Sequence, residues 1–234
     1  LQTKRLGGQK VKNKKIIILI ISIVIIIGLI FFIKNNYKFS KHGNNISNKS
    51  AEEVKEYILN IESYKATMQV TVKSNKNENN YIVLQKYNKE SNIFKQEILE
   101  PENIRGVQFI YDGTNLKIEN TKLNLSKIYE NYEYIESNDL GLVAFIEDFK
   151  KDNKSKCYEE NGVITLETEV TKSNKYLLSK KLYINKEQGK IEKMEIRDMA
   201  QNVKIYILYN EIEINTTSKE EILAFSVSTF EENI

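Results

Sequence analysis

Residues 64–73, YKATMQVTVK, decide the fold class because their side chains change character at every second position. Successive side chains of an extended chain point to opposite faces, so this alternation separates an apolar face from a polar one. The apolar face would carry Ala66, Met68, Val70 and Val72. The segment therefore predicts a β-strand with one buried face and one face in water.

The same period of two recurs along the chain on both sides of a central helical stretch. Turn chemistry separates these segments, most clearly at Asp112-Gly113. The further predicted strands are 81–87, 93–99, 107–111, 116–119, 164–170, 178–184, 191–196 and 203–209. Because short turns join consecutive strands antiparallel, we expect a meander of about nine strands.

Two segments have helical spacing instead. Ser50 and Glu53 have the spacing of a capping box, and Asp139 is the expected N-cap of the second helix. The apolar positions are Val54, Tyr57, Ile58 and Ile61 in the first helix and Leu142, Phe145, Ile146 and Phe149 in the second. We expect a mainly β domain over residues 50–234, with both helices covering the concave face of a curved antiparallel sheet or unclosed barrel.

Residues 16–33, IIILIISIVIIIGLIFFI, form a run of 18 residues without a charge. A helix of that length spans roughly 27 Å, which is close to the thickness of a bilayer core. The run predicts a single transmembrane helix, with Ile16, Ile20, Ile25, Leu29 and Ile33 as anchor residues.

The charges flanking this span predict its orientation. Six basic residues precede it and three follow closely, so the basic tail at 1–15 is expected in the cytoplasm. Residues 34–49 are polar and would tether an extracytoplasmic domain at 50–234 to the cell membrane. A cleaved signal peptide is the alternative, but Phe31 and Phe32 stand where a small-residue cleavage site is expected. The uncleaved anchor is therefore favoured.

The net charge of +3 is unevenly distributed. Nine of the 35 Lys and Arg residues lie in residues 1–42, which contain no acidic residue. The remaining 26 are outnumbered by 32 Asp and Glu, so residues 43–234 carry a charge of −6. A domain of that sign repels phosphate backbones, and we expect no nucleic-acid partner.

The sequence offers few groups for catalysis. It has one His and one Cys, and it lacks the common nucleophile, zinc-protease and phosphate-loop motifs. Glu97, Glu100 and Glu102 could form a carboxylate pair for sugar cleavage, but such clusters are common on acidic surfaces. Cys157 has no neighbouring base that would hold it as a thiolate. We expect no enzyme activity, no catalytic or metal site and no cofactor.

Three stretches carry a resemblance to a known family: 61–69 (IESYKATMQ), 100–107 (EPENIRGV) and 111–116 (YDGTNL). With the order of elements over about residues 50–230, they resemble the LolA/LolB-like lipoprotein carrier superfamily and, within it, clostridial GerS-like germination and sporulation proteins. The resemblance implies an unclosed barrel of about eleven strands without a catalytic centre. It also implies carriage or sensing of acylated lipoproteins, or protein binding; GerS-like proteins are associated with a cell-wall amidase that acts in spore-cortex modification.

The chain departs from secreted carriers by its uncleaved anchor and from GerS lipoproteins by lacking a lipobox cysteine. A shuttle must leave the membrane, so we expect the domain to bind a protein of the cell envelope rather than to carry a lipid. The alternative is a lipid or lipoprotein binder that uses the concave cavity. The expected contact residues are Tyr129, Tyr132 and Tyr134, unless these tyrosines simply pack against the sheet.

Overall fold

The computed structural model describes residues 49–74, 76–132, 139–174, 177–216 and 222. The chain divides into two units, 1–43 and 44–234, and all of the described residues belong to the second unit. Within them no helix has both the length and the apolar character needed to cross a membrane. The predicted span at 16–33 and nearly all of the predicted tether lie outside the described residues.

Two α-helices, a short 3-10 helix and one sheet make up the described domain. The helices are α2 (Ala51–Leu59), η1 (Glu102–Ile104) and α4 (Leu142–Lys151). The strands are β1 (Ser63–Lys73), β2 (Glu78–Asn88), β3 (Ile93–Glu100), β4 (Val107–Tyr111), β5 (Leu116–Asn120), β6 (Leu125–Tyr129), β7 (Lys156–Glu160), β8 (Val163–Asn174), β9 (Leu177–Asn185), β10 (Lys190–Arg197) and β11 (Val203–Ile214).

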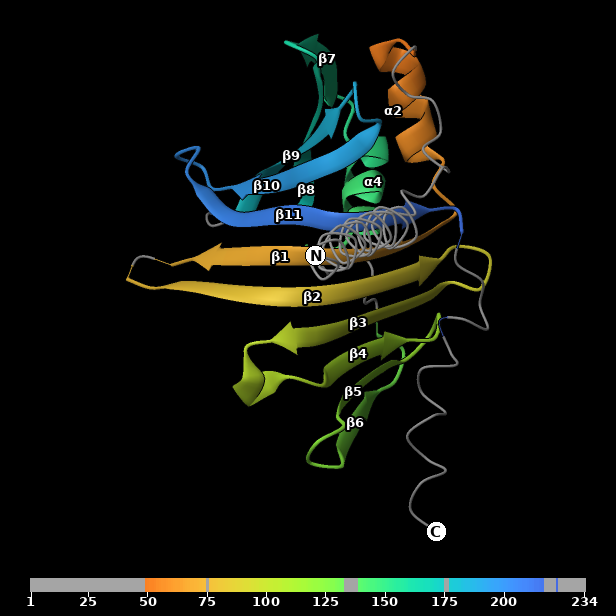
Figure 1. The fold of residues 1–234 in the computed structure, drawn as a ribbon, viewed down its shortest axis with the longest axis vertical. Coiled ribbons are helices and arrows are strands. Elements are labelled where there is room, and N and C mark those ends of the chain that lie inside the picture. The colour runs from red at the N-terminus through yellow and green to blue at the C-terminus, as the bar shows by residue number, and fades with distance from the viewer. Residues whose placement is uncertain (1–48, 75, 133–138, 175–176, 217–221, 223–234) are drawn as a thin grey trace, which may run out of the picture. The chain divides into compact units, whose positions relative to one another are not determined.

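All eleven strands form one antiparallel sheet in the order β6-β5-β4-β3-β2-β1-β11-β10-β9-β8-β7. The first and last strands pair in the middle of the sheet, where Val70 of β1 lies opposite Ile207 of β11 (Figure 1). The two ends of the sheet, β6 and β7, do not pair with each other, so the barrel remains open. The prediction of a mainly β, curved and unclosed sheet with two helices is confirmed. The nine predicted strands are present, and β6 and β7 are additional.

Strand β1 has the predicted amphipathic register. Ala66, Met68 and Val70 are buried in the core, whereas Gln69 between them is exposed. On the same face lie apolar side chains of β8, β9 and β10 and the buried stripes of both helices. The alternation read from residues 64–73 therefore identifies the face of the sheet on which the core is built.

Helix α2 begins as predicted. The backbone N–H of Glu53 donates to Ser50 Oγ at 3.3 Å, and Ser50 N–H donates to Glu53 Oε2 at 2.8 Å. These hydrogen bonds from Ser50 lower the pKa of Glu53, because they favour the carboxylate form. The predicted capping box is thus present, and Val54 and Ile58 are buried beneath it.

Helix α4 begins at a different residue from the one predicted. Gly141 is its N-cap and makes no side-chain cap hydrogen bond, whereas the expected cap Asp139 lies 3.1 Å from Lys180 Nζ. A buried ammonium is a stronger partner for a carboxylate than the free N–H groups of a helix, which explains the difference. The predicted apolar stripe is buried as expected; its members are Leu142, Phe145, Ile146 and Phe149.

Charged side chains fasten α4 to the sheet. Lys180 of β9 is 1% exposed, and its Nζ lies 2.7 Å from Asp148 Oδ2 in the helix. The other oxygen of Asp148 accepts the N–H of Thr171 in β8 at 3.0 Å. At the end of the helix, Asp152 Oδ2 accepts the N–H of Glu169 at 2.9 Å. Helix α4 is therefore bound to two neighbouring strands by ionic and polar contacts in addition to its apolar stripe.

The opposite face of β9 and β10 carries a second ionic cluster centred on Glu195. Lys193 Nζ and Arg197 donate to its carboxylate at 2.8 and 2.6 Å, and the Tyr183 hydroxyl donates at 3.1 Å. Burial alone would raise the pKa of Glu195, but the hydrogen bonds from Lys193 and Arg197 outweigh burial and lower it. Burial and the adjacent Glu195 carboxylate raise the pKa of Tyr183 to about 12.

Candidate functional site

Strand β6 forms one edge of the sheet and continues from β5 through a tight turn. The side chain of Asn120 closes this turn by accepting the N–H groups of Lys122 and Leu123, both at 3.1 Å. Asn124 has a φ of 50°, in the left-handed region that asparagine tolerates better than most residues. The turn chemistry therefore fixes the hairpin that presents β6.

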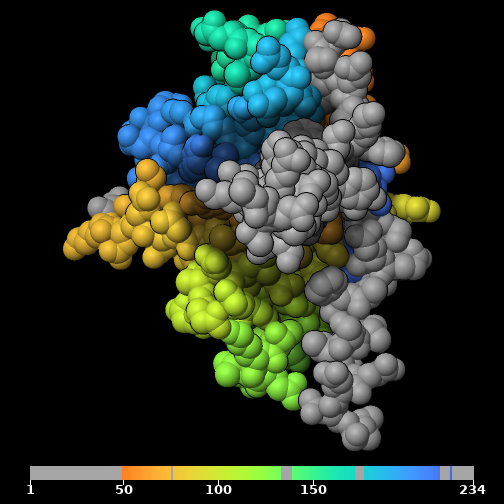
Figure 2. Space-filling view, in the orientation of Figure 1, coloured from red at the N-terminus to blue at the C-terminus, as the bar shows by residue number. Residues whose placement is uncertain are grey.

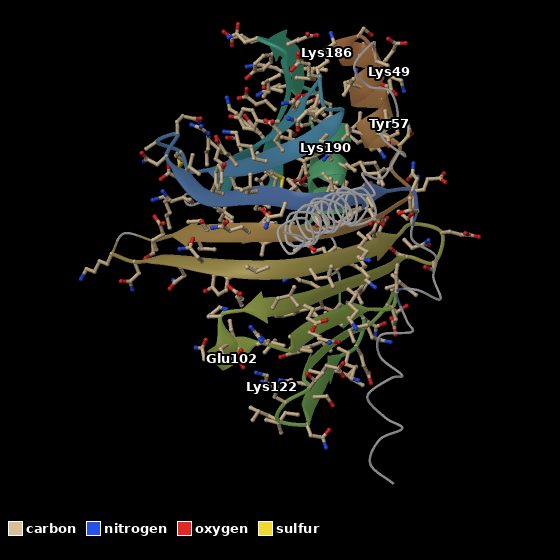
Figure 3. The ribbon with its side chains drawn as sticks, in the orientation of Figure 1. Lys49, Tyr57, Glu102, Lys122, Lys186 and Lys190 are labelled. Atoms are coloured by element: carbon tan, nitrogen blue, oxygen red, sulfur yellow. The ribbon has the colours of Figure 1, made fainter. Side chains whose placement is uncertain are left out.

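The tip of this hairpin is tied to the segment before β4. Lys122 forms an ion pair with Glu102 in η1, and Figure 3 shows the two labelled side chains at neighbouring positions. The backbone N–H of Thr121 donates to the carbonyl of Gly106 at 3.2 Å. Gly106 has a φ of 84°, and a Cβ there would lie only 2.7 Å from Thr121 Oγ1. Glycine is thus required for the close approach that supports the hairpin.

Apolar side chains gather on β6 and its turn. Seven large apolar side chains are exposed among the described residues, and five of them lie on or beside this strand. The five are Leu123 (64% exposed), Leu125 (63%), Ile128 (61%), Tyr129 (37%) and Tyr132 (39%). In Figure 2 the hairpin lies at the molecular surface, in green. We call these five residues the β6 edge.

The position of the two helices explains this exposure. Helix α2 packs against β7 and β8, and α4 packs against β8, at the end of the sheet remote from β6 (Figure 1). All five residues of β6 are exposed, on both faces of the strand. The β6 edge therefore lies beyond the part of the sheet that the helices cover.

Two of the three predicted contact tyrosines belong to this edge. The rings of Tyr129 and Tyr132 are tilted with centroids 6.0 Å apart. The N–H of Tyr132 donates to the carbonyl of Thr114 at 3.0 Å, which fixes its position beside the turn between β4 and β5. Lys127 Nζ lies 4.6 Å from the centroid of the Tyr129 ring. Tyr134, the third predicted residue, lies outside the described residues.

The sequence predicted no strand at 125–129, so Leu123, Leu125 and Ile128 were not among the expected contact residues. A strand exposed on both faces lacks the alternation by which the other strands were found. The turn signal was nevertheless present: Asn120 and Asn124 bracket residues 121–123 between two segments rich in apolar residues. This pair of asparagines is the feature of the sequence that indicates the hairpin.

The other edge of the sheet is protected in several ways. Strand β7 carries Lys156, Glu159 and Glu160, and charged side chains discourage the addition of a further strand. Glu159 also pairs with Lys186 at 2.8 Å, near the top of Figure 3. Helix α2 lies beside β7, where Cys157 Sγ donates to a carbonyl of the helix at 3.5 Å. The two edges therefore differ in chemistry, and no described helix or charged cluster protects β6 in the same way.

Two hollows on the described domain are open to solvent, and most of the residues that line them are polar or charged. One, of about 470 Å³, lies at the turn between β2 and β3; the other, of about 450 Å³, lies on the outer side of α2. The first is lined by Glu62, Ser63, Asn88, Lys89, Glu90 and Asn215, and the second by Lys49, Glu52, Glu53, Glu56, Tyr57 and Asn60. Neither of these two hollows is an enclosed apolar cavity of the kind that buries an acyl chain.

A family of sporulation proteins, described as "Sporulation protein YdcC-like", matches residues 13–223. The chain belongs to this family. The comparison with curated proteins found no match. The YdcC-like match covers the whole described domain, including both edge strands.

Several solved structures are similar to this YdcC-like chain. One is a chain in the structure of the CwlD amidase of Clostridioides difficile in complex with the GerS lipoprotein. That chain is 26% identical to this one, and the match has a TM-score of 0.46 and covers 71% of this chain and 96% of that chain. A LolA superfamily protein of Nitrosomonas europaea is 12% identical, with a TM-score of 0.40 over 74% and 96%. An uncharacterized conserved protein of Thermus thermophilus is 12% identical, with a TM-score of 0.48 over 74% and 92%. The expected resemblance to LolA-like and GerS-like proteins is thus found.

Proposed function

We propose that this YdcC-like protein is a non-enzymatic, membrane-anchored module that binds a protein partner outside the cell membrane through the β6 edge. The observation that carries the proposal is that five of the seven large apolar side chains exposed among the described residues lie on or beside one edge strand. Soluble proteins seldom leave such side chains clustered in water unless they form an interaction site. Tyrosine is common in such sites because it offers a large, rigid and amphipathic surface.

The anchor is part of the same proposal. The uncharged run at 16–33 and the basic residues before it support a single span with the described domain on the outer side. An anchor raises the effective concentration of the domain for any partner held at the same membrane. It also opposes the departure from the membrane that a lipid shuttle needs.

Membership of a sporulation family directs the proposal to the envelope of the sporulating or germinating cell. The resemblance to GerS-like proteins makes a cell-wall amidase the first partner to test. The two open hollows described above offer less support to the alternative ligand, a lipid or acyl chain, which an enclosed apolar cavity would bind.

The test is capture of proteins from solubilised membranes of sporulating cells by the tagged full chain. We expect a specific protein to be captured by the unchanged chain and lost with Leu125→Ser/Ile128→Ser. The matched control is Met199→Ser, because Met199 is 67% exposed but lies in the turn between β10 and β11, and this variant should capture as well as the unchanged chain. Equal capture by all three chains would overturn the β6 edge as the contact. Stoichiometric acyl chains without a captured protein would support the carrier instead.

Protease accessibility tests the proposed location. Protease added to intact cells stripped of their wall should digest the domain beyond about residue 50, if the charge bias sets the orientation. Full protection of that domain in intact cells, with digestion only after lysis, would place it on the cytoplasmic side of the membrane and contradict this proposal.

A further inference from the structure

We propose that the partner adds an extended segment to β6 as a twelfth, antiparallel strand, and that this segment places an acidic side chain opposite Lys127 with apolar side chains two residues to either side. This inference rests on the proposed function and specifies how the β6 edge recognises its partner. Three features of the edge carry it: the free side of the strand, its single cation and its contrast with β7.

The backbone of β6 offers the framework for an added strand. β6 pairs with β5 along its whole length, from Leu116 opposite Tyr129 to Asn120 opposite Leu125. Its other side has no strand neighbour in the described sheet, because β6 is the terminal strand. The outward-facing N–H and C=O groups of an edge strand can hydrogen-bond to an extended peptide, which gains backbone hydrogen bonds from the ladder.

The side chains of β6 specify what that peptide must carry. Leu125, Lys127 and Tyr129 share one face of the strand, since they lie opposite Asn120, Ile118 and Leu116. Ile128 projects from the other face, opposite Lys117. Cross-strand neighbours stabilise a sheet when apolar side chains meet apolar ones and opposite charges meet. The matching strand therefore presents apolar side chains to Leu125, Tyr129 and Ile128.

Lys127 determines the charge of the partner. Among the described residues it forms no ion pair, and its Nζ lies over the Tyr129 ring at 4.6 Å. Lys117 and Lys122 of the same hairpin, by contrast, are paired with Glu119 and Glu102. A carboxylate on the added strand would form an ion pair with Lys127, the one charged residue of β6. A second copy of this chain fits less well. If two β6 strands paired side by side, antiparallel and over their whole length, Lys127 of one copy would lie opposite Lys127 of the other.

The contrast with β7 argues that this exposure is specific to one edge. Charged side chains and α2 protect β7, although both strands are edges of the same sheet and both have five residues. Tyr158 is the one large apolar side chain exposed on β7, whereas β6 exposes large apolar side chains on both of its faces. Exposure on both faces is what an added strand needs.

The test uses the full chain in lipid nanodiscs and two fluorescent peptides, with empty nanodiscs as the blank. One peptide contains Val-Val-Glu-Thr-Val, whose residues would face positions 129 to 125 in turn, and the other has Lys in place of Glu. We expect the acidic peptide to bind about fivefold more tightly than the basic one, from cross-strand charge pairing. Lys127→Glu should reverse this preference. Lys156→Glu, which changes an exposed lysine on β7, should leave it unchanged.

A third peptide identifies the mode of binding. The acidic peptide methylated at alternate backbone nitrogens cannot complete the ladder, and we expect its binding to be lost. Equal binding of the methylated peptide, a preference unaffected by Lys127→Glu, or no binding of any peptide would overturn strand addition. If sedimentation instead showed a dimer that Lys127→Glu alters, a second copy would occupy the edge and the proposal would be wrong. Loss of protein capture by Leu125→Ser/Ile128→Ser despite a negative peptide result would leave the proposed function standing without this mode of binding.

Discussion

Replacing Lys180 by Met tests whether an internal ion pair holds α4 on the sheet. Methionine keeps most of the apolar stem of lysine but removes the charge that lies 2.7 Å from Asp148 and 3.1 Å from Asp139. Removing one partner of a buried ion pair typically costs about 3–5 kcal/mol, because the other charge stays buried without compensation. Asp148 would keep its hydrogen bond from Thr171, so we expect the lower end, a loss of about 3 kcal/mol in the free energy of unfolding.

The measurement is urea unfolding of the full chain in mild detergent, followed by the β-sheet signal in circular dichroism. The matched control is Lys181→Met, one residue along the same strand on the opposite face. Lys181 pairs with Glu167 at 3.1 Å, but both side chains are partly exposed, so its loss should cost at most about 1 kcal/mol. If the two variants unfolded within error of each other, the argument that Lys180 forms an internal electrostatic bond would be refuted.

Local geometry gives three further predictions. The native pKa of Glu195 lies below the unfolded value of 4.5, so the ionised carboxylate stabilises the fold above pH 4.5 and this stabilisation is lost as the pH falls below 4.5. Glu195→Gln should therefore make the free energy of unfolding depend less on pH in the range below 4.5. Gly106→Ala should cost about 1–3 kcal/mol in urea unfolding, because its φ of 84° and the contact with Thr121 both exclude a Cβ; an unchanged midpoint would contradict this. Ser50→Ala should cost about 1 kcal/mol through loss of the α2 cap, with Ser126→Ala, at an exposed position of β6, as the near-neutral control.

Local chemistry was a good guide wherever one side of an element meets the core. The alternation of residues 64–73 and the capping box at Ser50 both depend on contacts within a few residues, and both are present in the structure. Helix α4 was predicted from its apolar stripe for the same reason. Its first residue was not, because the position of Asp139 depends on Lys180, which lies far along the chain and is recognisable as buried only in the folded sheet.

The sequence predicts only part of the β6 edge, because the strand itself has no local signature. The excess of tyrosine and glutamate drew attention to residues 128–136, but those residues were read as an irregular loop. Both edge strands lack a buried face, so the period of two that reveals inner strands is missing from them. Leu125 and Ile128 are exposed because the strand order places them on the terminal strand of the described sheet, which local sequence does not determine.

The most direct test of the central claim is site-specific photo-crosslinking in sporulating cells. A photoreactive amino acid is placed at Ile128 on the β6 edge, or at Met199 as the control, in the full membrane-bound chain. The two side chains are exposed to a similar extent, 61% and 67%, so accessibility alone should not separate them. The proposed function predicts a discrete crosslinked protein from position 128 and none from position 199. The same products from both positions, or none from position 128, would contradict it.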